Sequence, residues 1–134
     1  MPEFSKQSLA RLRTCHPDLL RLFSVVVKRF DCSVLCGYRA RAEQNDLYRH
    51  GRSRLKYPNS RHNHKPSLAV DVAPYPLDWS DRERFCLFAG YVLGAADRMG
   101  IPIRWGGDWD KNTLLSDNRF DDLPHFELDL TGQG

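Results

Sequence analysis

Hydrophobic residues recur along this chain with two different periods, one typical of helices and one typical of strands. Helical spacing occurs over residues 5–13, from residue 16 through residue 30, over about 42–50, and from 80 to about 99. In the third of these helices we expect Leu47 and Tyr48 to point inward. The fourth is the longest, and Ser80 with Glu83 has the spacing of a capping box at its start.

Strand-like patterns lie between these helices, at residues 33–37, 68–72, 101–105 and 124–130. Within 68–72 the side chains alternate, so that Leu68, Val70 and Val72 point one way while Ala69 and Asp71 point the other. A basic, polar segment at 52–66 and a long one at 106–123 are expected to be loops. Because helices and strands do not alternate regularly, the pattern predicts a mixed α+β fold, with residues 1–134 forming a single domain.

Composition narrows the class of protein. Hydrophobic residues make up 41% of the chain and charged residues 28%, which is typical of a folded globular protein. No run approaches the roughly 20 apolar residues of a membrane span, so we expect no membrane insertion. The first residues lack the basic start and apolar stretch of a signal peptide, which predicts synthesis in the cytoplasm.

The charge and the cysteines exclude two further classes of site. The net charge is only +3 and the arginines cluster on no single helix, so a nucleic-acid partner is not expected. The chain has four cysteines, which we expect to be reduced and mostly buried. Cys32 and Cys36 are spaced like half of a metal site, but no second close pair follows. We therefore predict that both pack on one face of a strand.

Asp71 is the residue that directs attention to chemistry, because it interrupts an otherwise apolar strand. A buried carboxylate must be paired, hydrogen-bonded or bound to a metal, although a surface-facing aspartate would also fit the pattern. His62 and His64 lie in the loop just before this strand, and His125 begins the last one. Two histidines and one carboxylate, with a position left open for water, form a known catalytic zinc arrangement.

The ordered motifs resemble a known family. Its metal pattern is Ser-x-His, then Ala-x-Asp, and much later a second His. The matching segments are Ser60-Arg61-His62-Asn63, Ala69-Val70-Asp71, Trp105-Gly106-Gly107-Asp108-Trp109 and Asp122-Leu123-Pro124-His125, preceded by Gly37-Tyr38-Arg39 and Gly51-Arg52. In this order they are similar to the zinc peptidases that comprise D-Ala-D-Ala carboxypeptidases and L-alanyl-D-glutamate endopeptidases. They look most like the single-domain phage endolysins of that family.

The resemblance implies a role for each matching residue. The Zn²⁺ ligands would be His62, Asp71 and His125, the catalytic base would be Asp122, and Arg39 and Ser60 would face the substrate. It also implies a small fold with a mainly antiparallel sheet packed by helices, like that of Hedgehog and D-Ala-D-Ala peptidase domains.

Two positions have rivals. His64 has the seven-residue spacing to Asp71 that many members show, whereas His62 is nine residues away but keeps the Ser-x-His-Asn context. We favour His62. Glu127 shares the face of His125 in a strand and competes with Asp122 as the base, and we favour Asp122 from its position in the family motif.

The function implied by the resemblance is hydrolysis of peptidoglycan stem peptides, at the L-Ala–D-Glu bond, by a monomeric phage endolysin with antimicrobial action. The enzyme would reach the wall after the inner membrane is opened. The alternatives are a D-Ala-D-Ala carboxypeptidase and a non-catalytic module of the same fold that binds the cell wall.

Overall fold

The computed structural model describes residues 2–115 and 121–130. In these residues it contains α-helices, one 3₁₀ helix and the strands of one sheet. Their bounds are α1 Lys6–Leu12, α2 Pro17–Val26, β1 Cys32–Cys36, α3 Arg41–Arg49, η1 Arg61–Asn63, β2 Ala69–Pro74, α4 Arg82–Met99, β3 Ile103–Gly106 and β4 Asp122–Leu128. The expected α+β class is confirmed. The predicted loop at 106–123 lies partly outside the described residues.

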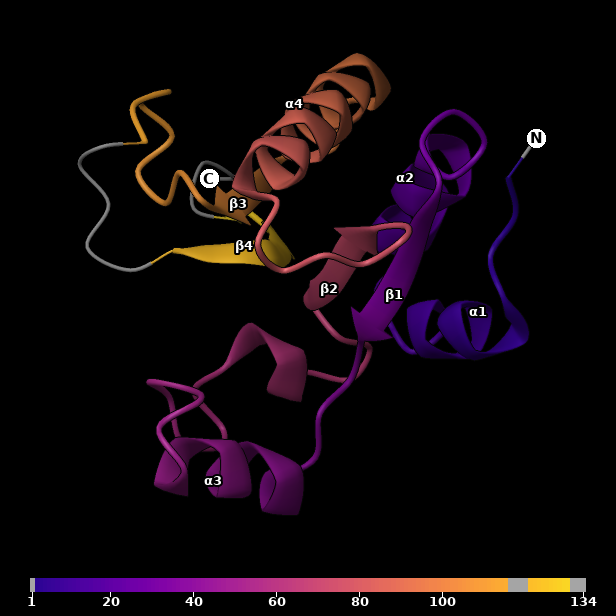
Figure 1. The fold of residues 1–134 in the computed structure, drawn as a ribbon. Helices are drawn as coiled ribbons and strands as arrows, with labels where there is room; N and C mark the ends of the chain where they lie inside the picture. Colours follow the sequence, from indigo (N-terminus) through magenta and orange to yellow (C-terminus); the bar gives the residue numbers. More distant parts are fainter. Residues whose placement is uncertain (1, 116–120, 131–134) are drawn as a thin grey trace.

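The sheet has the order β1-β2-β4-β3, and every neighbouring pair is antiparallel. In Figure 1, α2 and α4 lie to one side of this sheet, while α3 and the η1 segment lie to the other. Val70, Val72 and Phe126 belong to the buried core cluster, which also contains residues of α2 and α4. The opposite face of the same strands is therefore left free to carry polar side chains.

Helix ends follow the local sequence, with one correction. Ser5 caps α1 by accepting a hydrogen bond from the Ser8 backbone N–H. The capping box expected from Ser80 is wrong, because α4 is capped one residue later by Asp81, whose side chain accepts from the Arg84 N–H. The Ser80 hydroxyl instead donates to Asp78. Both residue types are favoured as N-caps, but the charged Asp81 side chain is also stabilised by the positive end of the helix dipole.

Two further expectations fail in the segment that leads from α3 to β2. Tyr48 is 40% exposed, and the fully buried residue of α3 is Gln44. The stretch expected to be a surface loop contains η1, in which His62 and Asn63 are buried. Among the described residues, no helix is long and apolar enough to cross a membrane.

An irregularity in β1 separates Cys32 from Cys36. Cys32 pairs in register with Pro74 and Cys36 with Asp71, and the register shifts between Val34 and Cys36. Cys32 therefore packs in the core, whereas the Cys36 sulfur accepts a hydrogen bond from Arg39 at 3.6 Å on the polar side. The prediction that both cysteines share one face is wrong, because a bulge reverses the side-chain alternation. All four cysteines are free.

Candidate metal centre and active site

Asp71 and His125 are brought together by strand pairing. They are directly opposed in the antiparallel ladder between β2 and β4, and Asp71 Oδ1 lies 3.3 Å from His125 Nδ1. Each alternates with a core residue, Asp71 with Val70 and His125 with Phe126, so both side chains project from the polar face of the sheet. The expected orientation of Asp71, on the face opposite Val70 and Val72, is what the structure shows.

His62 reaches the same point from the short helix η1. Ser60 and Asn63 form a reciprocal capping box, in which the Ser60 hydroxyl accepts from the His62 N–H and Asn63 Oδ1 accepts from the Ser60 N–H. This turn directs the His62 ring inward, where it is only 2% exposed. His64 is exposed on the other side of the turn. The structure therefore places His62, and not His64, beside Asp71 and His125.

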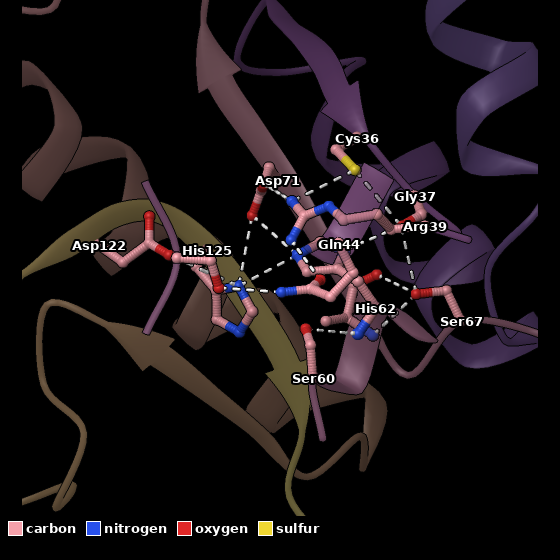
Figure 2. Close-up of polar contacts among 12 residues, drawn as sticks. Cys36, Gly37, Arg39, Gln44, Ser60, His62, Ser67, Asp71, Asp122 and His125 are labelled. Atoms are coloured by element: carbon pink, nitrogen blue, oxygen red, sulfur yellow. Dashed lines mark hydrogen bonds and ion pairs between the residues drawn. The ribbon is translucent and has the colours of Figure 1, made fainter. Parts of the chain in front are cut away.

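The donor atoms of these side chains have the spacing of a metal site (Figure 2). His62 Nε2 lies 3.2 Å from Asp71 Oδ1 and 3.3 Å from His125 Nδ1. Ligands arranged tetrahedrally around zinc at about 2.0 Å are separated from one another by about 3.3 Å. The three atoms could thus hold one small divalent ion without rearrangement, and their free side would leave a fourth position open.

Each histidine has its second ring nitrogen fixed by an acceptor. His62 Nδ1 donates to the Gly37 carbonyl at 2.8 Å, and His125 Nε2 donates to Glu127 Oε1 at 2.8 Å. In the neutral form of each ring the remaining nitrogen is the one with a lone pair, and it points to the shared centre. This is the usual way in which proteins orient histidine ligands.

The electrostatics of the cluster favour a cation. Burial opposes the charge of His62, but the Asp71 carboxylate outweighs it and raises the pKa of the imidazole to about 10. Burial would raise the pKa of Asp71, yet the charge of His62 and the hydrogen bond from His125 hold it well below its usual range. The centre thus keeps an ionised carboxylate that stabilises positive charge beside it.

Gly37 allows the close approach that this arrangement needs. A Cβ atom at this position would overlap the Thr14 hydroxyl and the Arg11 carbonyl at the end of α1. Only glycine can therefore let β1 pass so near to α1 and present its carbonyl to His62.

Glu127 contacts His125 at Nε2, the ring nitrogen that does not point to the metal centre. Its Oε1 accepts from His125, and its Oε2 accepts from Arg104 Nη2 at 2.8 Å, with Arg61 Nε a further 3.7 Å neighbour. Burial works to raise the pKa of Glu127, but His125 and Arg104 together lower it to about 2. Because both oxygens are engaged and the group is a very weak base, it is suited to orienting His125.

Asp122 lies at the start of β4, three residues before His125, and lines the same cavity as His125. Its Oδ2 is 3.8 Å from His125 Nδ1, and its side chain is 37% exposed. Burial and, next, the nearby Asp71 carboxylate raise the pKa of Asp122 above its usual value. Gly106 pairs with it on β3, where a Cβ atom would overlap the Asp122 carbonyl.

Arg39 is held beside the centre by a buried polar network. Its guanidinium lies 3.6 Å from Asp71 Oδ2 and donates to Gln44 Oε1 at 3.0 Å. Gln44 also accepts from Asn63 and donates to Ser53 and to the Leu55 carbonyl. Sequence reasoning included Gln44 only as part of a segment similar to the family, without a role of its own, and it did not assign Glu127 the role of orienting His125. The available signal was a polar residue at the inward position of a helix, which is ambiguous without the fold.

A cavity of about 830 Å³ opens over this cluster. Its lining includes the candidate centre, Asp122, Arg39 and Ser60, together with Trp79 and Trp109. Of Trp105, Asp108 and Trp109, which belong to one of the segments that carry the family resemblance, only Trp109 lines this cavity, with its ring 5.4 Å from that of His125. Trp105 belongs to the core, and Asp108 lines a separate, smaller cavity.

Comparisons with known proteins agree with one another. The chain matches the family model described as phage L-alanyl-D-glutamate peptidase over residues 2–129. It is 31% identical over 113 residues to the L-alanyl-D-glutamate peptidase of Escherichia phage T5, covering 81% of this chain and 82% of that protein. It is 30% identical over 118 residues to the peptidoglycan L-alanyl-D-glutamate endopeptidase CwlK of Bacillus subtilis strain 168, covering 75% of this chain and 62% of that one. The crystal structure of the L-Ala D-Glu endopeptidase ChiX of Serratia marcescens superposes with a TM-score of 0.75 and 30% identity, covering 96% and 92% of the two chains.

Proposed function

Because the chain belongs to the phage L-alanyl-D-glutamate peptidase family, we propose that it hydrolyses the L-Ala–D-Glu amide bond in the stem peptides of bacterial peptidoglycan. The family resemblance drawn from the motifs is confirmed. The observation that carries the proposal is the convergence of His62, Asp71 and His125 at one point of a cavity that also contains Asp122. A buried ligand set next to an accessible carboxylate is what metal-assisted hydrolysis of an amide requires.

We propose Zn²⁺ as the metal, held by His62 Nε2, Asp71 Oδ1 and His125 Nδ1. Two imidazoles and one carboxylate form a donor set that zinc accepts. The distances between the three atoms match the separation of ligand atoms arranged tetrahedrally around zinc. A bound zinc ion would polarise the substrate carbonyl and lower the pKa of a coordinated water to about 7.

Asp122 is the general base in this proposal. Its carboxylate lines the cavity with Oδ2 3.8 Å from His125 Nδ1, and it is 37% exposed, so that water can reach it. It would accept a proton from the attacking water as the new C–O bond forms at the alanine carbonyl. It would then deliver that proton to the glutamate nitrogen as the C–N bond breaks, so that a free amine leaves.

Arg39 would bind the negative charge of the substrate. It is held by Gln44 and lies against Asp71, so its planar guanidinium is fixed before substrate arrives. It could stabilise the oxyanion of the tetrahedral intermediate or hold the free carboxylate that every glutamate residue retains beside the scissile bond. The Ser60 oxygen caps η1, so we propose that its hydroxyl proton is what it offers to substrate.

We propose that the protein acts as a phage endolysin, in keeping with the phage origin of the matched family and of the T5 relative. In this role the enzyme would be made in the host, act as a monomer, and meet the wall once the inner membrane is opened. The relatives from B. subtilis and S. marcescens are also named as endopeptidases of the L-Ala–D-Glu bond. The proposed bond specificity therefore does not depend on the endolysin role.

Mass spectrometry of fragments released from purified Gram-negative peptidoglycan tests this function. We expect new amino-terminal glutamate on the released peptides, and free L-alanine carboxylates on the glycan. Release of single D-alanine residues would instead identify a D-Ala-D-Ala carboxypeptidase, and binding without any release would identify a wall-binding module. Omission of Zn²⁺ after chelation, and the variant Asp122→Asn, provide the controls.

A further inference from the structure

Trp79 is a large apolar side chain placed in an unusual position, at the rim of the active-site cavity. It lines this cavity yet is 61% exposed, the second-largest exposed fraction among the exposed large hydrophobic side chains of the described residues. Tryptophan is enriched at recognition surfaces, because its ring offers a large apolar face together with a polar N–H group. The catalytic groups described above do not use it.

The indole is held in place and does not swing freely. Its ring stacks on that of Phe85, with centroids 5.5 Å apart and planes only 15° from parallel. Phe85 itself is 1% exposed and anchors the start of α4 in the core. One face of Trp79 is thereby covered by a fixed neighbour.

The loop that carries Trp79 is tied down on both sides. Arg84 donates to the carbonyls of Tyr75 and Pro76 at 2.6 and 3.0 Å. Asp78 accepts from both the backbone and the hydroxyl of Ser80, at 3.0 and 2.6 Å. The loop thus presents the indole as a preorganised platform, which lowers the entropy lost when a ligand stacks on it.

An ion pair connects the start of α4, next to Trp79, to the segment that carries the proposed base. Arg82, three residues beyond Trp79, forms an ion pair of 2.7 Å with Asp121, and both line the cavity. Asp121 precedes the proposed base Asp122. The Arg82–Asp121 pair therefore joins the start of α4 to the start of β4 and adds hydrogen-bonding groups to the cavity that the indole and the centre share. In Figure 1 the segment leading into α4 passes close to β4.

An exposed aromatic plane that shares a cavity with a charged, planar hydrogen-bonding pair suits a pyranose ring. The sugar has an apolar C–H face that stacks on indole and hydroxyls that bond to guanidinium and carboxylate groups. In peptidoglycan the stem peptide hangs from an amino sugar through L-alanine, so a sugar lies one residue from the bond cleaved. Two extended residues span at most about 7 Å, well within such a cavity.

We propose that Trp79, backed by Phe85 and lining the same cavity as the Arg82–Asp121 pair, is a saccharide subsite that binds the amino sugar of the glycan strand while the attached peptide is cleaved. This inference rests on the proposed function, because it assigns the glycan side of the same substrate. It makes the enzyme selective for stem peptides still attached to glycan.

The test compares two substrates that differ only in the sugar: a disaccharide-linked stem peptide and the same peptide without saccharide. For the wild-type enzyme we expect a higher kcat/KM on the disaccharide-linked substrate. Trp79→Ala should reduce the ratio of the two kcat/KM values by roughly tenfold, the loss expected for one stacked ring. Trp79→Phe should keep most of the wild-type ratio, because the phenyl ring can still stack. This variant also provides the test if the alanine variant folds poorly. Leu87→Ala is the matched control, since Leu87 is 67% exposed on α4 and lines neither cavity.

A binding measurement separates recognition from turnover. Peptide-free glycan strands should shift the indole N–H resonance of Trp79 in the NMR spectrum of the Asp122→Asn variant. An unchanged resonance, or an equal loss of kcat/KM on both substrates in Trp79→Ala, would overturn the saccharide assignment, the second by indicating a peptide contact. If the wild-type enzyme cleaved neither substrate, the proposed function itself would fail, which is a distinguishable result.

Discussion

Asp71 and His125 face each other across one antiparallel pair of strands, with Oδ1 and Nδ1 3.3 Å apart. The pairing positions them before any metal binds, because the ladder hydrogen bonds and the Phe126 core contact hold both backbones. His62 is the ligand that comes from a separate element, the short helix η1. The centre thus combines a rigid pair with a single side chain whose position depends on a turn.

Metal content of the histidine variants tests the ligand assignment. His62→Ala should lose nearly all bound zinc, because one of the three donors at 3.2 to 3.3 Å spacing is removed. His64→Ala should bind zinc as the wild type does, because His64 is exposed on the other side of the turn. Elemental analysis of the purified proteins measures both. Zinc retained in the first variant and lost in the second would reverse the assignment.

Asp122→Asn should separate catalysis from metal binding. The amide has nearly the same shape but cannot accept the proton from water, so kcat should fall by roughly 10² to 10⁴. Zinc content should stay unchanged, because Asp122 is outside the proposed ligand set. Steady-state kinetics and metal analysis on the same preparation measure the two effects. A parallel loss of zinc would mean that Asp122 is a ligand and not the base.

Glu127→Gln should weaken metal binding without abolishing it. The variant replaces the charged acceptor of the His125 N–H, and substitutions of this type reduce metal affinity by roughly 10- to 100-fold. Competition with a coloured chelator measures the change. Arg104→Gln is the control, since it removes the Arg104–Glu127 ion pair and keeps the bond to His125. An equal effect in the control would assign the loss to the ion pair.

Gln44→Leu should destabilise the protein and disturb Arg39. The leucine removes the oxygen that accepts from both Arg39 Nη1 and Asn63 Nδ2, and the loss of these buried bonds costs about 1–3 kcal/mol in the free energy of unfolding. Gln7→Leu, at an exposed position of α1, is the matched control and should change stability little. Urea unfolding measures both variants. Indistinguishable midpoints for the two would contradict the role assigned to Gln44.

Thiol labelling tests the packing of the cysteines. Burial raises the pKa of Cys15 and of Cys32 to about 12, from an ordinary value of 9.0. Both thiols should therefore resist alkylation in the folded protein as the pH rises from 7 to about 10. Because the unfolded chain loses these protons near its lower pKa, stability should fall as the pH rises from 9 towards 12. Mass spectrometry after native labelling would reveal early modification at either site.

Much of the fold could be predicted from local patterns, and the reasons are visible in particular residues. Asp71 in an apolar strand, and the strand alternation around it, indicated both the sheet face and a polar site. The helix α4 was evident from its apolar spacing, although its cap was misplaced because Ser80 and Asp81 are adjacent and both can cap. A choice between such neighbours depends on contacts with Asp78, which no local pattern contains.

The rest depended on tertiary contacts. The sequence of β1 alone does not indicate the bulge that turns Cys36 toward Arg39. Gln44 is buried as the acceptor for Arg39 and Asn63, and Glu127 as the acceptor for His125. Their burial could therefore be predicted only once these partners were placed in the fold. The Ser-x-His-Asn context selected His62 although the seven-residue spacing to Asp71 pointed to His64, and the turn capped by Ser60 and Asn63 supplies the physical reason for the inward orientation of His62.

The alternation along β4 has an evolutionary consequence. Phe126 and Leu128 serve the core, while His125 and Glu127, one position away, serve the chemistry. Mutations that retune or silence the reaction can therefore accumulate on one side of a strand without eroding the other. Fold and catalysis are inherited here as separable traits, and selection can act on one while the other is preserved.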